Sequence, residues 1–171
     1  MKELSVIIPT LNINYGLRRL VKSIRVLGDD LEVIVVVPES IYRDVVSELN
    51  EFCLTIISES GSGIYSAMND GIKKATREYI MFFGDDDVLL NLPDKKHIEQ
   101  GSDLIIHDVF FGDSKIYRNH SLKYSLLVRN WCHQGLIFRR SLFETAGLYD
   151  LKYKYQEDHH FNIKVVFSKK I

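Results

Sequence analysis

The segment Tyr79-Ile80-Met81-Phe82-Phe83-Gly84-Asp85-Asp86-Asp87 joins a short hydrophobic run directly to three adjacent carboxylates. The run has the length and aromatic content of a buried β-strand, and Gly84 ends it. No basic residue follows before Lys95, so the mutual repulsion of the carboxylates has no cationic neighbour to offset it. Carboxylate oxygens are the ligands that hard divalent cations prefer. The segment therefore predicts a metal site at a strand end, with a solvated acidic turn as the alternative, because Gly-Asp-Asp also suits a turn.

Upstream of this segment, strand-like and helix-like patterns alternate. The predicted strands are 4–8, 31–37, 54–57 and 79–83, and the predicted helices are 17–27, 41–52 and 64–75. Such alternation indicates βαβ units, hence an α/β fold with a mostly parallel sheet covered by helices. Ligands of these sheets bind beyond the carboxyl ends of the strands, which is where the three carboxylates are expected.

Downstream of the acidic segment, the pattern changes to a hairpin, a short strand and three helical segments. Their predicted bounds are 103–111 and 115–117 for the hairpin strands, 135–138 for the strand, and 121–130, 140–146 and 156–167 for the helices. The chain shows no internal repeat, low-complexity segment or linker. We therefore expect one domain over residues 1–171.

The composition also favours one globular domain. A chain of 171 residues with 46% hydrophobic and 26% charged residues can bury a core of its own. Its net charge of −1, without long runs of one sign, argues against a nucleic-acid partner. Cys53 and Cys132 are far apart and next to bulky residues, so we expect buried free thiols and a reducing, cytoplasmic compartment. No apolar stretch approaches the ~20 residues that a membrane span requires.

Three further polar segments carry side chains suited to chemistry. Cys132-His133-Gln134-Gly135 could bind phosphate or sugar hydroxyls, although a lone histidine is more often structural. Gln156-Glu157-Asp158-His159-His160 suits general-base or metal chemistry, but acids also favour the first turn of a helix. Gly61-Ser62-Gly63 precedes a predicted helix, as in dinucleotide-binding loops. Ser66 replaces the third glycine and the loop follows the third strand, which argues against a nucleotide-dependent oxidoreductase.

Taken together, these segments resemble the family 2 glycosyltransferases of the GT-A fold. The matching segments are Ser5-Val6-Ile7-Ile8-Pro9-Thr10, Gly63 to Ile72, Phe82 to Asp87, His133-Gln134 with Phe138 to Phe143, Gly147-Leu148-Tyr149-Asp150, and Glu157-Asp158. Their order and spacing cover nearly the whole chain and are far more specific than any one segment. The branch that builds bacterial exopolysaccharide, capsule or O-antigen is the most similar, because a Gly-Ile-Tyr-x-Ala-Met-Asn segment is typical of it. The resemblance implies a Rossmann-like, three-layer nucleotide-diphospho-sugar transferase fold.

The resemblance also implies roles for the acidic residues. The acidic cluster is similar to the DxD-type motif, which holds Mn²⁺ or Mg²⁺ on the diphosphate of a nucleotide sugar. Asp86 matches the main metal ligand and Asp87 its support, whereas Asp85 falls on a variable position that is also assigned to the donor site. Asp158 matches the catalytic base of the family's Glu-Asp motif, with Glu157 as its neighbour.

The other implied site residues contact the donor or the acceptor. They are Thr10, Asn12, Asn69, Lys73, His133 and Gln134. The family usually has an acid that recognises uracil after the second strand. Here Val37 occupies that position, and Glu39 is the candidate substitute. Gly61 and Ser66 also stand where the family often has acids, which weakens the expectation of a particular nucleotide.

The function implied is that of an inverting, metal-dependent glycosyltransferase in polysaccharide biosynthesis. A sugar would pass from a nucleotide sugar, usually UDP-linked, to a glycan or a lipid-linked acceptor, with Asp158 as general base. Residues 1–90 would bind the nucleotide sugar and residues 91–171 the acceptor. Relatives usually continue for tens of residues past the Glu-Asp helix, so a non-catalytic nucleotide-sugar-binding member is the alternative. The expected location is the cytoplasm, with peripheral association at the inner face of the cell membrane.

Overall fold

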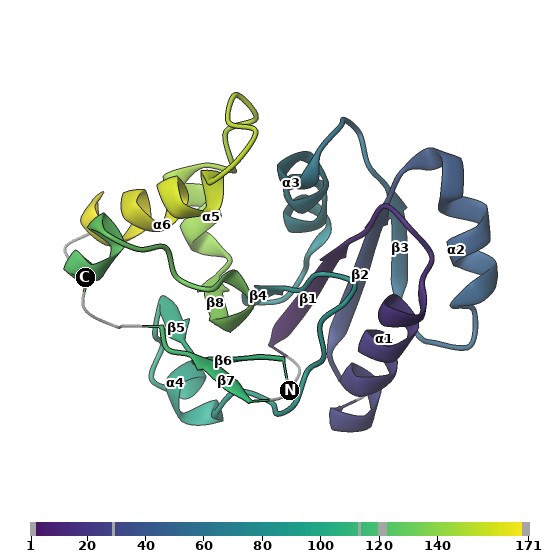
Figure 1. Cartoon of the computed structure of the whole chain (residues 1–171), viewed down its shortest axis with the longest axis horizontal. Coiled ribbons are helices and arrows are strands. Elements are labelled where there is room, and N and C mark those ends of the chain that lie inside the picture. The colour runs from purple at the N-terminus through teal and green to yellow at the C-terminus, as the bar shows by residue number, and fades with distance from the viewer. Residues whose placement is uncertain (1–2, 29, 113, 120–122, 169–171) are drawn as a thin grey trace.

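A six-stranded sheet forms the centre of the structure, a computed structural model that describes residues 3–28, 30–112, 114–119 and 123–168. Its strands are β1 (Leu4–Pro9), β2 (Glu32–Val37), β3 (Thr55–Ser58), β4 (Tyr79–Phe82), β5 (Leu104–Ile106) and β8 (Leu136–Arg139). They lie in the order β3-β2-β1-β4-β8-β5 (Figure 1). β1 to β4 are parallel, whereas β8 is antiparallel to both β4 and β5. The prediction of a mostly parallel α/β sheet is confirmed.

Helices cover both faces of this sheet, which gives three layers (Figure 1). One face carries α1 (Tyr15–Leu27), α2 (Tyr42–Glu48) and the short α4 (Lys95–Glu99), and the other carries α3 (Ile64–Lys74), α5 (Ser141–Ala146) and α6 (Glu157–Ser168). Successive side chains of a strand point to opposite faces, so each strand contributes to two cores. On β1, Val6 and Ile8 belong to the α1 core and Ile7 to the α3 core. Among the described residues, no helix has the length and apolarity needed to cross a membrane.

Local chemistry explains how α1 and α3 are positioned beside β1. Asn14 caps α1 by accepting a hydrogen bond from the backbone N–H of Leu17. Four buried apolar side chains then fix the helix on the sheet: Leu17, Leu20, Val21 and Ile24. On the opposite face, α3 approaches so closely that a Cβ on Gly71 would lie 2.4 Å from Cγ2 of Ile7. The glycine is therefore required for this packing.

Two predicted helices differ from the structure. The helix predicted at 41–52 is shorter: a 3₁₀ turn at Glu39–Ile41 precedes α2, and the backbone N–H of Phe52 bonds to the carbonyl of Leu49 in the turn that ends the segment. The segment predicted at 121–130 is a 3₁₀ helix, Lys123–Leu127, and residues 121–122 lie outside the described part. In both places the hydrophobic spacing marked a helical segment but not its end or its hydrogen-bond type.

The predicted hairpin is also divided. Its first part, β5, belongs to the central sheet, and the chain then forms a separate hairpin of β6 (Val109–Phe111) and β7 (Lys115–Tyr117). Ile105 of β5 is buried beside β8, whereas Phe110 and Phe111 of β6 are exposed. Both segments are apolar, so the sequence did not show that they are two strands of different sheets. The expectation of two buried thiols is wrong for Cys53, which is exposed in the loop before β3; Cys132 is half-buried, and both are free.

A hydrogen-bonded carboxylate fastens the amino end of the sheet. Glu32, at the start of β2, accepts hydrogen bonds from the hydroxyls of Ser5 and Thr76 and from the backbone N–H of Thr76. Burial raises the pKa of the Glu32 carboxyl, but these bonds and the charge of Arg77 outweigh it, so the pKa lies below its ordinary value. Glu32 thus joins β1, β2 and the connection between α3 and β4.

Replacing Glu32 with glutamine is expected to lower the free energy of unfolding at neutral pH by about 1–2 kcal/mol, a value reduced for partial solvent exposure. The amide cannot accept all three bonds. Because the folded-state pKa is depressed, this stabilisation is complete above the ordinary pKa of glutamate and is lost as the pH falls through the folded-state value. Urea unfolding of wild type and E32Q at pH 7 and near pH 3 measures it. Glu99→Gln, at an exposed position, is the control. The prediction would be contradicted if wild type and E32Q differed in their free energy of unfolding by the same amount at both pH values.

Candidate functional site

The carboxyl ends of β1 and β4 form the centre of the candidate site. β1 has β2 on one side and β4 on the other, so the order of the strands along the sheet reverses direction at β1. Ligands of α/β sheets bind at such a switch point. Thr10 follows β1, and its hydroxyl donates to Oδ2 of Asp85, which follows β4, at 2.6 Å. The side-chain amide of Asn14 donates to the same oxygen at 3.1 Å. Asp85 therefore holds the two loops together.

Asp86 is the most accessible of the three carboxylates. It is exposed, and its carboxylate accepts no hydrogen bond from any residue that the structure describes, whereas its backbone carbonyl accepts one from Arg19 at 2.8 Å. Its Oδ1 lies 3.0 Å from the point that a Cβ on Gly84 would occupy, and Oδ2 of Asp87 lies 3.3 Å from that point. Both carboxylates thus lie over Gly84, with Asp86 free to bind a ligand.

Asp87 is more enclosed than Asp86. Burial raises the pKa of its carboxyl above the ordinary value, as do the charges of Asp86 and Asp85, and the bonds from the Gly84 N–H and the Gln134 side chain only partly offset this. A bound positive charge would favour the ionised form. Within the described residues, no group of three or more His, Cys, Asp or Glu side chains is arranged to hold a metal ion. Asp86 and Asp87 nevertheless fit a Mg²⁺- or Mn²⁺-type ion that shares substrate phosphates, because such ions need only one or two carboxylates.

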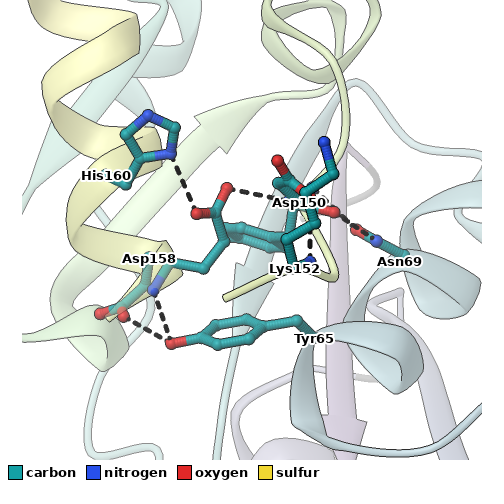
Figure 2. A network of polar contacts seen from close by, with 8 residues as sticks. Tyr65, Asn69, Asp150, Lys152, Asp158 and His160 are labelled. Carbon is teal, nitrogen blue, oxygen red and sulfur yellow. Dashed lines mark hydrogen bonds and ion pairs between the residues drawn. The ribbon is translucent and has the colours of Figure 1, made fainter. Parts of the chain in front are cut away.

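A second carboxylate site lies at the start of α6. The Tyr65 hydroxyl of α3 donates to Oδ1 of Asp158 at 2.9 Å, and the Asn130 side-chain amide donates to Oδ2 at 2.6 Å. The backbone N–H of Glu157 donates back to the Tyr65 hydroxyl at 3.0 Å (Figure 2). Asp158 is half-buried, and its two oxygens are held by donors from two other segments. A carboxylate fixed in this way is suited to accept a proton from a nearby hydroxyl.

Glu157 supports this arrangement from inside the protein. It is buried, and its two oxygens accept the backbone N–H of Asp150 and bond the Nδ1 of His160, each at 2.9 Å (Figure 2). The preceding residue, Gln156, has a φ of 60°, a left-handed conformation that is uncommon for a non-glycine residue. Such conformations persist where surrounding contacts impose them, and they concentrate at functional sites. Glu157 therefore orients the turn that presents Asp158.

The segment 132–134 lies between the two carboxylate sites. The Gln134 side chain lies near Asp87 and lowers the pKa of that carboxyl, and its Oε1 lies 3.2 Å from Sγ of Cys132. Burial raises the pKa of the Cys132 thiol, and the charges of Asp87 and Asp158 both add to the rise. The His133 ring packs 4.9 Å from the ring of Phe82, centroid to centroid, and both of its nitrogens are buried without a partner among the described residues. Burial lowers the pKa of His133 to about 4, so the ring is neutral at pH 7.

The other predicted residues are less directly placed at the site. Asn69 is buried, and its amide exchanges two hydrogen bonds with the backbone of Tyr149, at 2.9 and 3.0 Å. The amide oxygen of Asn69 and one of its N–H groups are thus used inside the protein. Lys73 is exposed and pairs with Asp70 at 3.1 Å. Glu39 is exposed in the turn after β2. Asn12 is exposed beside Thr10, and its backbone N–H donates to the Thr10 hydroxyl oxygen at 3.2 Å.

Three residues of the site were not predicted from the sequence. Tyr65 and Asn130 hold Asp158, and Asn14 holds Asp85. Tyr65 lies in the Gly-Ile-Tyr segment that carried the resemblance, so a signal was present without a role. Asn130 ends the predicted helix at 121–130, which carries no distinctive motif, and Asn14 precedes the predicted helix at 17–27 without belonging to any motif.

This architecture, a three-layer α/β fold with an acidic cluster beyond β4, defines the class of GT-A nucleotide-diphospho-sugar transferases. The sequence matches the family model "Glycosyl transferase family 2" over residues 5–146. The chain therefore belongs to glycosyltransferase family 2. The match ends before α6, so it does not include Asp158.

Individual relatives agree with this assignment. The chain is 32% identical over 175 residues to PGL/p-HBAD biosynthesis glycosyltransferases of Mycobacterium bovis and Mycobacterium tuberculosis, covering 94% of this chain and 68% of theirs. Its fold matches a crystal structure of S. aureus TarS with a TM-score of 0.75 at 20% identity, covering 95% of this chain and 33% of that one. S. aureus TarS 1–349 in complex with UDP gives a TM-score of 0.75 at 20% identity, covering 95% and 54%. The chain thus spans between a third and just over half of these solved chains.

Proposed function

We propose that this chain transfers a sugar from a nucleotide sugar, with UDP-sugars preferred, to a hydroxyl of a glycan or lipid-linked acceptor, with inversion. The observation that carries the proposal is the pair of carboxylate sites on either side of segment 132–134. The Asp86 carboxylate is exposed and accepts no hydrogen bond from the described residues, as expected of a group that meets a metal diphosphate. Asp158 is hydrogen-bonded in a fixed orientation, as expected of a base. Residues 1–90 would bind the donor and residues 91–171 the acceptor.

The reaction would proceed by one displacement. The acceptor oxygen attacks the anomeric carbon opposite the leaving group, Asp158 takes the hydroxyl proton, and the bond between that carbon and the diphosphate oxygen breaks. Asp86 and Asp87 would hold a divalent cation, which when bound neutralises charge on the departing diphosphate. Gln134 lies beside Asp87 and lowers the pKa of its carboxyl, which favours the ionised form that a cation needs. A single inversion at the anomeric carbon follows from attack on the opposite face.

The relatives support the choice of donor and acceptor classes. S. aureus TarS 1–349 has been solved in complex with UDP and with UDP-GlcNAc, which favours a UDP-sugar donor here. The mycobacterial relatives are named for PGL/p-HBAD biosynthesis, which favours a role in glycan assembly. A lipid-linked acceptor would bring the protein to the inner face of the cell membrane by peripheral association. The second candidate, a nucleotide-sugar binder without transfer, is favoured by Val37, Gly61 and Ser66, which stand where family members often have acids.

Calorimetry with UDP, GDP, dTDP and CMP, each with and without Mn²⁺, tests the donor site. We expect UDP to bind most tightly and only in the presence of the metal, because the exposed Asp86 contributes through a shared cation. Release of UDP from UDP-sugars then distinguishes transfer from binding alone. Tight binding without any release supports the second candidate, and no nucleotide binding under either condition would contradict both.

A further inference from the structure

Tyr65 occupies a position that the proposed chemistry does not yet use. It lies in the first turn of α3, on the donor half, while Asp158 lies in the first turn of α6, on the acceptor half (Figure 2). Its hydroxyl donates to Oδ1 of Asp158 and accepts the backbone N–H of Glu157. We infer that Tyr65 is a positioning residue that fixes the Asp158 carboxylate for proton transfer. The inference rests on the proposed function, in which Asp158 is the base.

The tyrosine is held as a hydrogen-bond donor. Burial raises the pKa of Tyr65 to about 12, and the neighbouring charge of Asp158 adds to the rise. The hydroxyl therefore keeps its proton at any physiological pH. That proton is directed at Asp158, and one oxygen lone pair is taken by the Glu157 N–H, so the group has a single favourable orientation.

Asn130 completes the restraint on the other carboxylate oxygen. Its side-chain Nδ2 donates to Oδ2 of Asp158 at 2.6 Å, and its Oδ1 accepts from Asn162 at 3.2 Å. Its backbone carbonyl accepts the Tyr117 hydroxyl at 2.8 Å, which anchors the segment. With one donor on each oxygen, rotation of the carboxylate breaks at least one hydrogen bond. Each oxygen retains acceptor capacity for an incoming hydroxyl.

Removal of the Tyr65 hydroxyl should therefore change the orientation of the Asp158 carboxylate more than the affinity for the donor. The phenyl ring of Tyr65→Phe keeps the packing against Tyr149, whose ring centroid is 5.5 Å away. Misplacement of a reacting group by about 1 Å can cost on the order of 100-fold in rate. We expect kcat to fall about 10- to 100-fold, with the KM for the donor and the Kd for UDP changed less than about 2-fold.

Tyr149→Phe is the matched control. Its hydroxyl is buried and has no hydrogen-bond partner among the described residues. Its removal should therefore leave kcat, the KM for the donor and the Kd for UDP unchanged. The two variants each remove one tyrosine hydroxyl, from neighbouring rings, and only the Tyr65 hydroxyl bonds to Asp158. The rate is followed as UDP release from UDP-GlcNAc with Mn²⁺ and water as acceptor.

A double-mutant cycle separates this role from general structural damage. In the Asp158→Asn background, Tyr65→Phe should cause no further loss, because its effect passes through the missing carboxylate. Independent, multiplicative losses would overturn the inference while leaving the proposed base in place. Retained turnover in Asp158→Asn would instead overturn the proposed function.

A second measurement does not depend on turnover. Three-bond NMR couplings of the Asp158 side chain report its χ1 rotamer in the full chain. We expect one rotamer in the wild type and in Tyr149→Phe, and averaged couplings in Tyr65→Phe. An Asp158 side chain that keeps one rotamer in Tyr65→Phe overturns the inference, whichever donor the enzyme uses.

Discussion

Asp158→Asn is expected to lower turnover by about 10²- to 10⁴-fold, the usual contribution of a general base. Asparagine has nearly the same shape as aspartate, but its single amide oxygen can accept only one of the hydrogen bonds from the Tyr65 hydroxyl and the Asn130 amide. The bonds of Glu157 to the backbone N–H of Asp150 and to His160 are unaffected, so the start of α6 should keep its position. The amide cannot take the proton of the acceptor hydroxyl. UDP release measures the rate, and calorimetry measures the UDP affinity, which should remain within about 2-fold of the wild type.

Asp44→Asn provides the control for this experiment, because Asp44 is an exposed residue in the first turn of α2, away from the candidate site. It should change neither rate nor affinity. Full turnover in Asp158→Asn would remove Asp158 as the base. A parallel loss of UDP affinity would show instead that the substitution disturbs the donor site.

Asp86→Ala is expected to weaken metal-dependent UDP binding on the order of 100-fold, since even indirect support of a metal ligand commonly contributes 10- to 100-fold. The carboxylate is exposed and accepts no hydrogen bond within the described residues, so its loss should leave the melting temperature nearly unchanged. Calorimetry with UDP, with and without Mn²⁺, gives the affinity, and thermal unfolding without ligand gives the stability.

Asp85→Ala is the informative comparison at the adjacent position. Asp85 accepts hydrogen bonds from Thr10 and Asn14, so its loss should reduce stability while Mn²⁺ dependence persists. Equal losses of metal dependence in the two variants would contradict the assignment of Asp86 as the main ligand. UDP binding by the wild type that needs no metal would contradict the metal site altogether.

Much of the fold could be predicted because its signals are local. Buried strands such as β2 are continuous β-branched runs, and α1 has apolar residues at a regular helical spacing. Alternation of such elements leaves few arrangements other than a parallel sheet covered on both faces. The ends of α2 and the division between β5 and β6 were not predictable in this way, because they depend on which segments pair with β8 and pack on the core.

The candidate site was predicted only at the level of motifs. The acidic cluster and the Glu-Asp pair stand out in the sequence because each is compact. The residues that hold them do not: Tyr65 and Asp158 are 93 positions apart, and Asn130 and Asp158 are 28 apart. Such contacts depend on how far and at what angle α3 and α6 pack on the sheet, which no local pattern specifies.

The sequence alone determined the α/β class and placed three carboxylates at the end of a buried strand, because hydrophobic periodicity and strand order are written along the chain. Tertiary structure alone decided what each carboxylate does. Asp85 is bound to Thr10 and Asn14 and serves the scaffold, whereas Asp86 remains exposed. The physical reason is that three identical side chains in sequence differ only in which distant donors the packed elements bring within about 3 Å of them.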